Sequence, residues 1–70
     1  MRARHFEISY CLNDSRRLFV QPDSHMTDDD AWYYACLHAD VGVWHGVDGA
    51  LLREQACRAG VTKVRWEELP

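Results

Sequence analysis

The clearest pattern in the sequence is an alternation of apolar and polar residues near the N-terminus. Phe6, Ile8 and Tyr10 fall on one side of this segment, and polar or small side chains fall on the other. A period of two is typical of a β-strand with one buried face, because successive side chains point to opposite faces. We therefore predict a strand over about residues 4–12, and its apolar character places it at the centre of a sheet.

A second strand is predicted after a turn. Residues 13–15 are Asn, Asp and Ser, which bond to their own backbone and tolerate tight turns. Alternation resumes over about residues 16–21 with Leu18 and Val20 directed inward, so the two strands are predicted to form a β-hairpin. Pro22 has no N–H group to donate to a sheet, and the second strand is expected to end before it.

Two helices are predicted in the middle of the chain. Thr27 precedes three aspartates, and this order predicts a helix start, because the hydroxyl accepts from a first-turn amide and carboxylates favour the positive end of the helix dipole. This helix is expected over about residues 28–40, with Trp32 on its apolar stripe. Asp48 is expected to cap a second helix over about residues 49–59.

A last alternation predicts a third strand over about residues 62–67, and the element order is therefore ββααβ. After two helices, we expect this strand to run antiparallel to the second strand and parallel to the first, beside which it lies. The predicted fold is an α+β two-layer sandwich, with a three-stranded mixed sheet of order 2-1-3 and two helices on one face. Its expected core consists of Phe6, Ile8, Tyr10, Leu18, Val20, Trp32, Ala35, Cys36, Leu52, Ala56, Val64 and Trp66.

Composition supports one small globular domain over residues 1–70. Hydrophobic residues make up 47% of the chain and charged residues 27%, which is typical of globular rather than disordered proteins. A net charge of −3 supplies no overall attraction to nucleic acid or to an anionic membrane. No run approaches about 18 apolar residues, no signal-peptide core follows the basic N-terminus, and three widely spaced cysteines fit a reducing compartment. We expect a soluble, cytoplasmic protein that does not enter membranes.

Three parts of the sequence carry a family resemblance. They are the run Asp30-Ala31-Trp32, the glycine at position 42 and the ending at residues 59–66. Together they resemble a family of short uncharacterised proteins found in pseudomonads. The resemblance implies a bacterial origin and a stand-alone small domain, and it brings no established activity or catalytic residue.

Residue spacing does not predict metal binding or catalysis. His25, Cys36, His38 and His45 lie in one stretch, but no pair is spaced to place two ligands on one rigid element. Cys57 is expected on a polar helix face near two arginines, which favours its thiolate, whereas the nearby helix C-terminus disfavours an anion. We expect no metal, no cofactor and no enzymatic activity.

Protein binding is the favoured interpretation of the surplus aromatic residues. The segment 41–47 is apolar where connections are usually polar, and it contains Trp44 and His45. Trp, Tyr and Arg dominate the energetics of protein interfaces. The predicted partner-binding residues are Tyr34, Trp44 and His45, with Phe19 as a second candidate on the outer sheet face, and the partner is another protein or a second copy of the chain. The alternative for Trp44 is that it folds back over the small core.

Nucleic-acid binding is the second interpretation. It uses the outer sheet face, where Arg17, Phe19, Lys63 and Arg65 are expected to stand together. An exposed aromatic ring among cations is what stacking on a single strand requires. Two glutamates on the same predicted face dilute the positive charge, and only one aromatic residue is available there.

Overall fold

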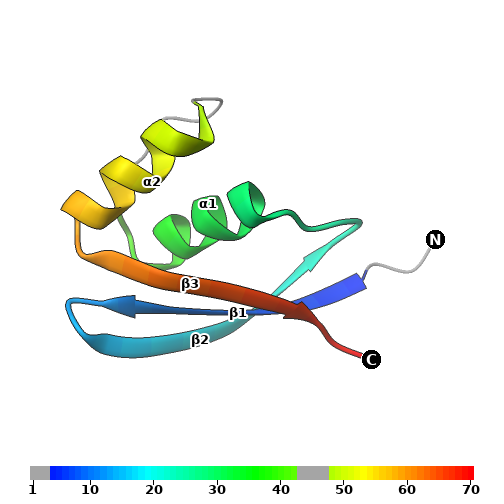
Figure 1. The fold of residues 1–70 in the computed structure, drawn as a ribbon. Helices are drawn as coiled ribbons and strands as arrows, with labels where there is room; N and C mark the ends of the chain where they lie inside the picture. Colours follow the sequence, from blue (N-terminus) through cyan, green and yellow to red (C-terminus); the bar gives the residue numbers. More distant parts are fainter. Residues whose placement is uncertain (1–3, 43–47) are drawn as a thin grey trace.

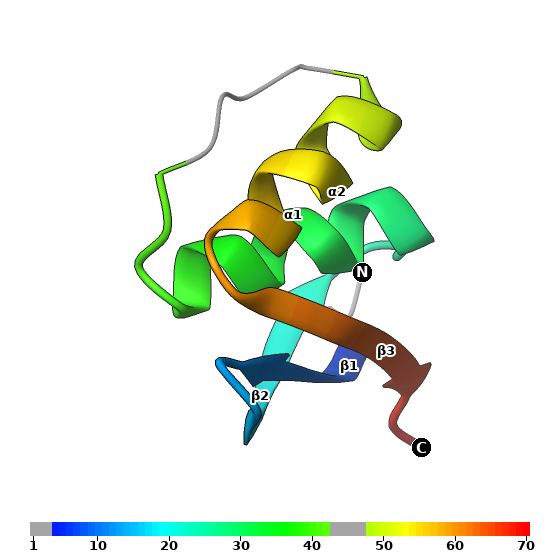
Figure 2. The same cartoon turned by 60° about the vertical axis from the view of Figure 1, so that its left-hand side comes forward.

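The computed structural model describes residues 4–42 and 48–70. Five elements follow one another in these ranges (Figure 1): β1 (Arg4–Leu12), β2 (Ser15–Asp23), α1 (Asp28–His38), α2 (Gly49–Arg58) and β3 (Val61–Glu68). The strands form one sheet of order β2-β1-β3, and both helices lie on the same side of it (Figures 1 and 2). The α+β class, the element order and the strand order are therefore confirmed.

The predicted mixed sheet is wrong, because β1 pairs antiparallel with both of its neighbours. A third strand parallel to β1 would require α2 to run back along α1, whereas the two helices run in the same direction (Figure 1). Gly49 at the start of α2 lies against the carboxylate of Asp29 in the first turn of α1. Consequently α2 ends near the β1–β2 turn, where the Asn13 N–H donates to the Gly60 carbonyl at 3.0 Å. β3 starts there and runs back along β1.

The turn between β1 and β2 contains two residues, one fewer than predicted. Asn13 and Asp14 have φ angles of 50° and 68°, so both adopt the left-handed conformation that the favoured two-residue hairpin turn requires. Leu12 therefore pairs with Ser15. Since side chains alternate along a strand, a difference of one residue exchanges the two faces of β2 completely.

This exchange corrects the predicted core. Phe19 pairs with the buried Ile8 and so faces the helices, against the prediction that it faces outward. Leu18 and Val20 retain 55% and 51% of their exposed surface on the opposite side of the sheet, and their assignment to the core is wrong.

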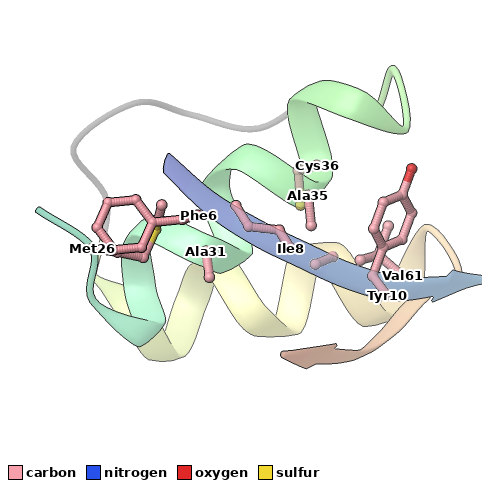
Figure 3. Packing of buried hydrophobic residues seen from close by; sticks show 9 residues of the cluster. Phe6, Ile8, Tyr10, Met26, Ala31, Ala35, Cys36 and Val61 are labelled. Atoms are coloured by element: carbon pink, nitrogen blue, oxygen red, sulfur yellow. The ribbon is translucent and has the colours of Figure 1, made fainter. Parts of the chain in front are cut away.

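The core lies between the sheet and the helices, along β1 and α1 (Figure 3). Small residues of α1 pack against large side chains of β1, so the helix approaches the sheet closely. Trp32, Val64 and Trp66 are only partly buried and pack against this core. The buried residues are Phe6, Ile8, Tyr10, Met26, Ala31, Ala35, Cys36, Leu52, Ala56 and Val61.

Both helix starts are capped by the predicted residues. The Thr27 hydroxyl accepts from the Asp30 N–H at 3.1 Å, and the Asp30 carboxylate accepts from the Thr27 N–H at 3.2 Å. These reciprocal bonds form a capping box, which satisfies two backbone donors at the end of α1. Asp48 accepts from the Ala50 N–H at 2.8 Å and caps α2 in the same sense.

β3 contains a bulge that changes its predicted alternation. Lys63 has a φ of 54°, and the register of β3 against β1 shifts beside it. Val61 is buried and Val64 packs against the core, while Thr62 pairs with Cys11 on the other side of the sheet. Regular alternation over residues 62–67 would place Thr62 on the same side as Val64, and the extra residue of the bulge is the reason for the difference.

Candidate functional site

No described element covers the side of the sheet away from the helices (Figure 2). We call it the open face. Residues that pair directly across antiparallel strands share a face, so the register defines its members. They are His5, Glu7, Ser9 and Cys11 of β1, Arg16, Leu18, Val20 and Pro22 of β2, and Thr62, Arg65 and Glu67 of β3.

The β2 side of the open face is apolar. Leu18 lies next to Ser9, Val20 lies next to Glu7, and Pro22 continues the row along the edge strand. Leu18 and Val20 are among the four large apolar side chains that stay substantially exposed in the described part of the chain. Exposed apolar side chains that adjoin one another mark interaction surfaces more often than isolated ones do.

The β1 and β3 side of the open face is charged. Glu7 stands directly opposite Glu67, and Arg65 stands opposite Ser9 in the next row. Like charges directly opposite each other destabilise a sheet, and neither glutamate forms a salt bridge with any residue that the structure describes. The folded state therefore gains nothing from this arrangement, and both carboxylates are available to a partner.

A hollow of about 250 Å³ lies in the middle of the open face. Ser9 is the smallest of its lining residues, and the others carry longer side chains. The hollow is an open depression in the sheet surface and is too shallow to surround a small molecule. Its lining consists of Glu7, Ser9, Arg16, Arg65, Trp66 and Glu67.

Phe19 belongs to the packing on the helix side of the sheet. Its ring stacks on that of His38 at a centroid distance of 4.3 Å and meets the Tyr10 ring edge-on at 6.1 Å. The Tyr10 hydroxyl lies 2.6 Å from His38 Nδ1. The predicted exposure of Phe19 on the outer face is therefore wrong, and this ring holds β2 to the end of α1.

The residues predicted for nucleic-acid binding do not come together. Arg17 pairs with Tyr10 and so lies on the helix side with Phe19, whereas Arg65 lies on the open face. Lys63 sits in the bulge of β3, the strand at the opposite edge from β2. Of the four residues, Arg65 is the one that the register places on the face on which the set was expected.

Tyr34 joins α1 to the end of β2. Its hydroxyl donates to the Asp23 carboxylate at 2.5 Å. This bond raises the pKa of Tyr34 to about 12 and lowers the pKa of Asp23 below its usual value. The contact holds two elements together, and partner binding by Tyr34 stays a prediction. Trp44 and His45 lie outside the described residues.

A comparison with known families places the chain. The sequence matches the profile of a family of unknown function, DUF6555, over residues 1–69. The chain belongs to the DUF6555 family. No curated protein and no solved structure matches this DUF6555 chain. Because the family carries no assigned activity, the function of its member must be argued from the open face and the chemistry around it.

The described part of the DUF6555 chain offers little reactive chemistry. Cys57 is exposed, while Cys36 is buried and burial raises the pKa of its thiol. Within residues 4–42 and 48–70, no three side chains of the His, Cys, Asp and Glu types gather to hold a metal ion. None of the described helices has the length and apolar character needed to cross a membrane.

The two residues that distinguish the open face are not identified by the alternation of the sequence. Alternation between Arg16 and Gln21 predicts Leu18 and Val20 in the core of the DUF6555 domain, although Phe19 between them is also apolar. The signal that places them correctly is the Asn13-Asp14 pair, since both residue types tolerate positive φ and can form a two-residue hairpin turn.

Proposed function

We propose that this protein is a non-enzymatic interaction module that binds another protein chain through the open face of its sheet. The observation that carries the proposal is the half-exposure of Leu18 and Val20, which adjoin on one edge strand. Full burial of a Leu or Val side chain stabilises by about 1.5–3 kcal/mol, and roughly half of that surface is still uncovered here. A partner that covers both side chains gains the free energy of burying this remaining apolar surface.

The mixed character of the open face favours a protein over a nucleic acid as its partner. Arg16 and Arg65 are balanced by Glu7 and Glu67, so the face presents no cationic track for a phosphate backbone. The aromatic ring needed for stacking, Phe19, packs on the helix side. An apolar row beside charges of both signs is the composition of a protein interface with a polar rim.

The proposed location, source and further contacts of the protein rest on its sequence. A cytoplasmic location follows from the expected reducing compartment, and a pseudomonad source follows from the resemblance of the sequence. Trp44 and His45 are proposed as further partner contacts, because the segment 41–47 is apolar in sequence.

The test is affinity capture from native lysate with two matched double variants. Leu18→Ser/Val20→Ser alters the open face. Leu37→Ser/Leu51→Ser alters helix leucines that are exposed to a similar extent, at 53% and 45%. The proposal expects one saturable protein partner that the first variant loses and the second retains, with unchanged melting temperatures for both.

Three other results would redirect the assignment. Equal loss in both double variants would contradict a role for the open face. Loss in Trp44→Ala alone would move the binding surface to the segment 41–47. Nucleic acid that co-purifies at low salt and dissociates at high salt would favour the alternative function, because phosphate contacts weaken steeply with salt.

A further inference from the structure

The two edges of the sheet differ in how they are protected from another strand. β3 carries a bulge at Lys63 and contacts both helices. Bulges and charged residues are devices that prevent edge-to-edge pairing. β2 pairs with β1 over all nine of its residues without a bulge, and its other edge faces no described strand. Its own such devices are the charged residues Arg16, Arg17 and Asp23 and the proline Pro22, which lie toward the two ends of the strand and not at Leu18, Phe19 or Val20.

The hairpin turn determines which main-chain groups of β2 point away from β1. Leu12 and Ser15 flank the two-residue turn, so this pair exchanges hydrogen bonds, and bonded and non-bonded pairs then alternate. It follows that the N–H and C=O groups of Leu18 and Val20 point outward. Pro22 falls on the same alternation, and its lack of an N–H therefore costs no bond to β1.

We propose that the strand that pairs with this edge is β2 of a second copy of the chain. The two β2 strands run antiparallel about a two-fold axis at Phe19 and extend the sheet to six strands. The inference rests on the proposed function, since it names the partner of the same apolar row. A symmetric contact of this kind uses one surface on both copies and closes on itself.

The side chains of β2 are complementary to themselves in this register. Leu18 lies opposite the partner's Val20, and this pair exchanges both main-chain hydrogen bonds. By symmetry, Val20 lies opposite the partner's Leu18, so four apolar side chains meet on the joined open faces. A slip of one residue would place Leu18 and Val20 opposite residues whose side chains lie on the helix side. Only registers that differ by an even number of residues therefore keep the apolar side chains on one face.

The charges of β2 also favour antiparallel pairing with a copy of itself. Arg16 and Arg17 lie in its first half, and its last residue is Asp23. Antiparallel pairing brings the arginines of each copy toward the acidic end of the other, with Arg17 opposite the partner's Gln21. Parallel pairing in register would instead place like charges opposite each other, which destabilises a sheet.

Sedimentation equilibrium over a wide concentration range tests the inference. The wild type is expected to rise from the monomer mass of 8.2 kDa toward twice that value. Val20→Pro removes an outward N–H and no bond to β1, and we expect it to weaken association at least about tenfold. Val20→Lys keeps the N–H and places a charge at an already exposed position, so it provides a second disruption if the proline variant does not fold.

Arg65→Glu distinguishes pairing through the β2 edge from contact through the open face. Arg65 is exposed on β3, at the far side of the open face from the β2 edge. Edge pairing expects this variant to dimerise like the wild type. A dimer that survives Val20→Pro and is lost in Arg65→Glu would overturn edge pairing and leave the open face as the contact. A wild type that stays monomeric at every concentration would overturn the inference, while the capture experiment with Leu18→Ser/Val20→Ser judges the proposed function separately.

Discussion

The two faces of this sheet are made by the same three strands but differ in what covers them. On the covered face, Phe6 and Ile8 are fully buried against the helices. On the open face, Glu7 lies between Phe6 and Ile8 in sequence, is not covered by a helix, and stands opposite a second glutamate, Glu67. Because the side chains of a strand alternate, residues that pack against the helices and residues that face the open side follow one another along each strand. Neighbouring substitutions should therefore have opposite kinds of effect.

The largest difference is expected between Phe19 and Leu18. Phe19→Ala removes the stacking on His38 and the edge contact with Tyr10, and we expect it to lower the free energy of unfolding by about 2 kcal/mol, since truncation of a fully buried Phe costs about 3–5 kcal/mol. Leu18→Ala, on the exposed side, is expected to change it by at most about 0.5 kcal/mol. Urea unfolding of both variants at low protein concentration measures the two values. Equal losses in the free energy of unfolding would mean that Leu18 and Phe19 do not lie on an exposed and a covered face of β2.

A smaller effect is expected from pH, through the hydrogen bond between Tyr34 and Asp23. The pKa of Tyr34 is raised to about 12 in the folded state, so its contribution is complete below the unfolded pKa of about 10 and is lost as the pH rises through about 12. The pKa of Asp23 is lowered, chiefly by the same bond, so its contribution is present above the unfolded pKa and is lost as the pH falls through the folded pKa.

Tyr34→Phe is the control for this pH dependence. It should flatten the alkaline decline in melting temperature and leave the part that comes from Tyr10, whose pKa is raised by burial. It should not alter association through the open face, because Tyr34 lies in the helix layer. An unchanged alkaline decline in Tyr34→Phe would show that the hydrogen bond does not contribute to stability.

The elements of this fold were predictable because their signals are local. Thr27 and Asp30 form the whole capping box and are three residues apart. In β1, polar or small residues occupy every second position. The faces of β2 were not predictable in the same way. Leu18, Phe19 and Val20 are three apolar residues in a row, so either face could be buried, and the length of the turn decides between them.

The direction of β3 depended on contacts between elements distant in the sequence. Gly49 lies against Asp29, and the Arg53 guanidinium donates to the same carboxylate at 2.7 Å, so the start of α2 is held at the start of α1. No local pattern encodes this contact. The candidate site depended on the same kind of information, because the exposure of Leu18 and Val20 follows from a register and from the absence of a fourth described strand.

Amide hydrogen exchange measured residue by residue at low and high protein concentration tests the central claim most directly. The amides of Leu18 and Val20 point outward, and we predict that their exchange slows as concentration rises and the edges pair. The amides of Arg17 and Phe19 already bond to β1 and serve as an internal reference within the same strand. Exchange at Leu18 and Val20 that is equally fast at every concentration would contradict the account, since the edge would then remain unpaired.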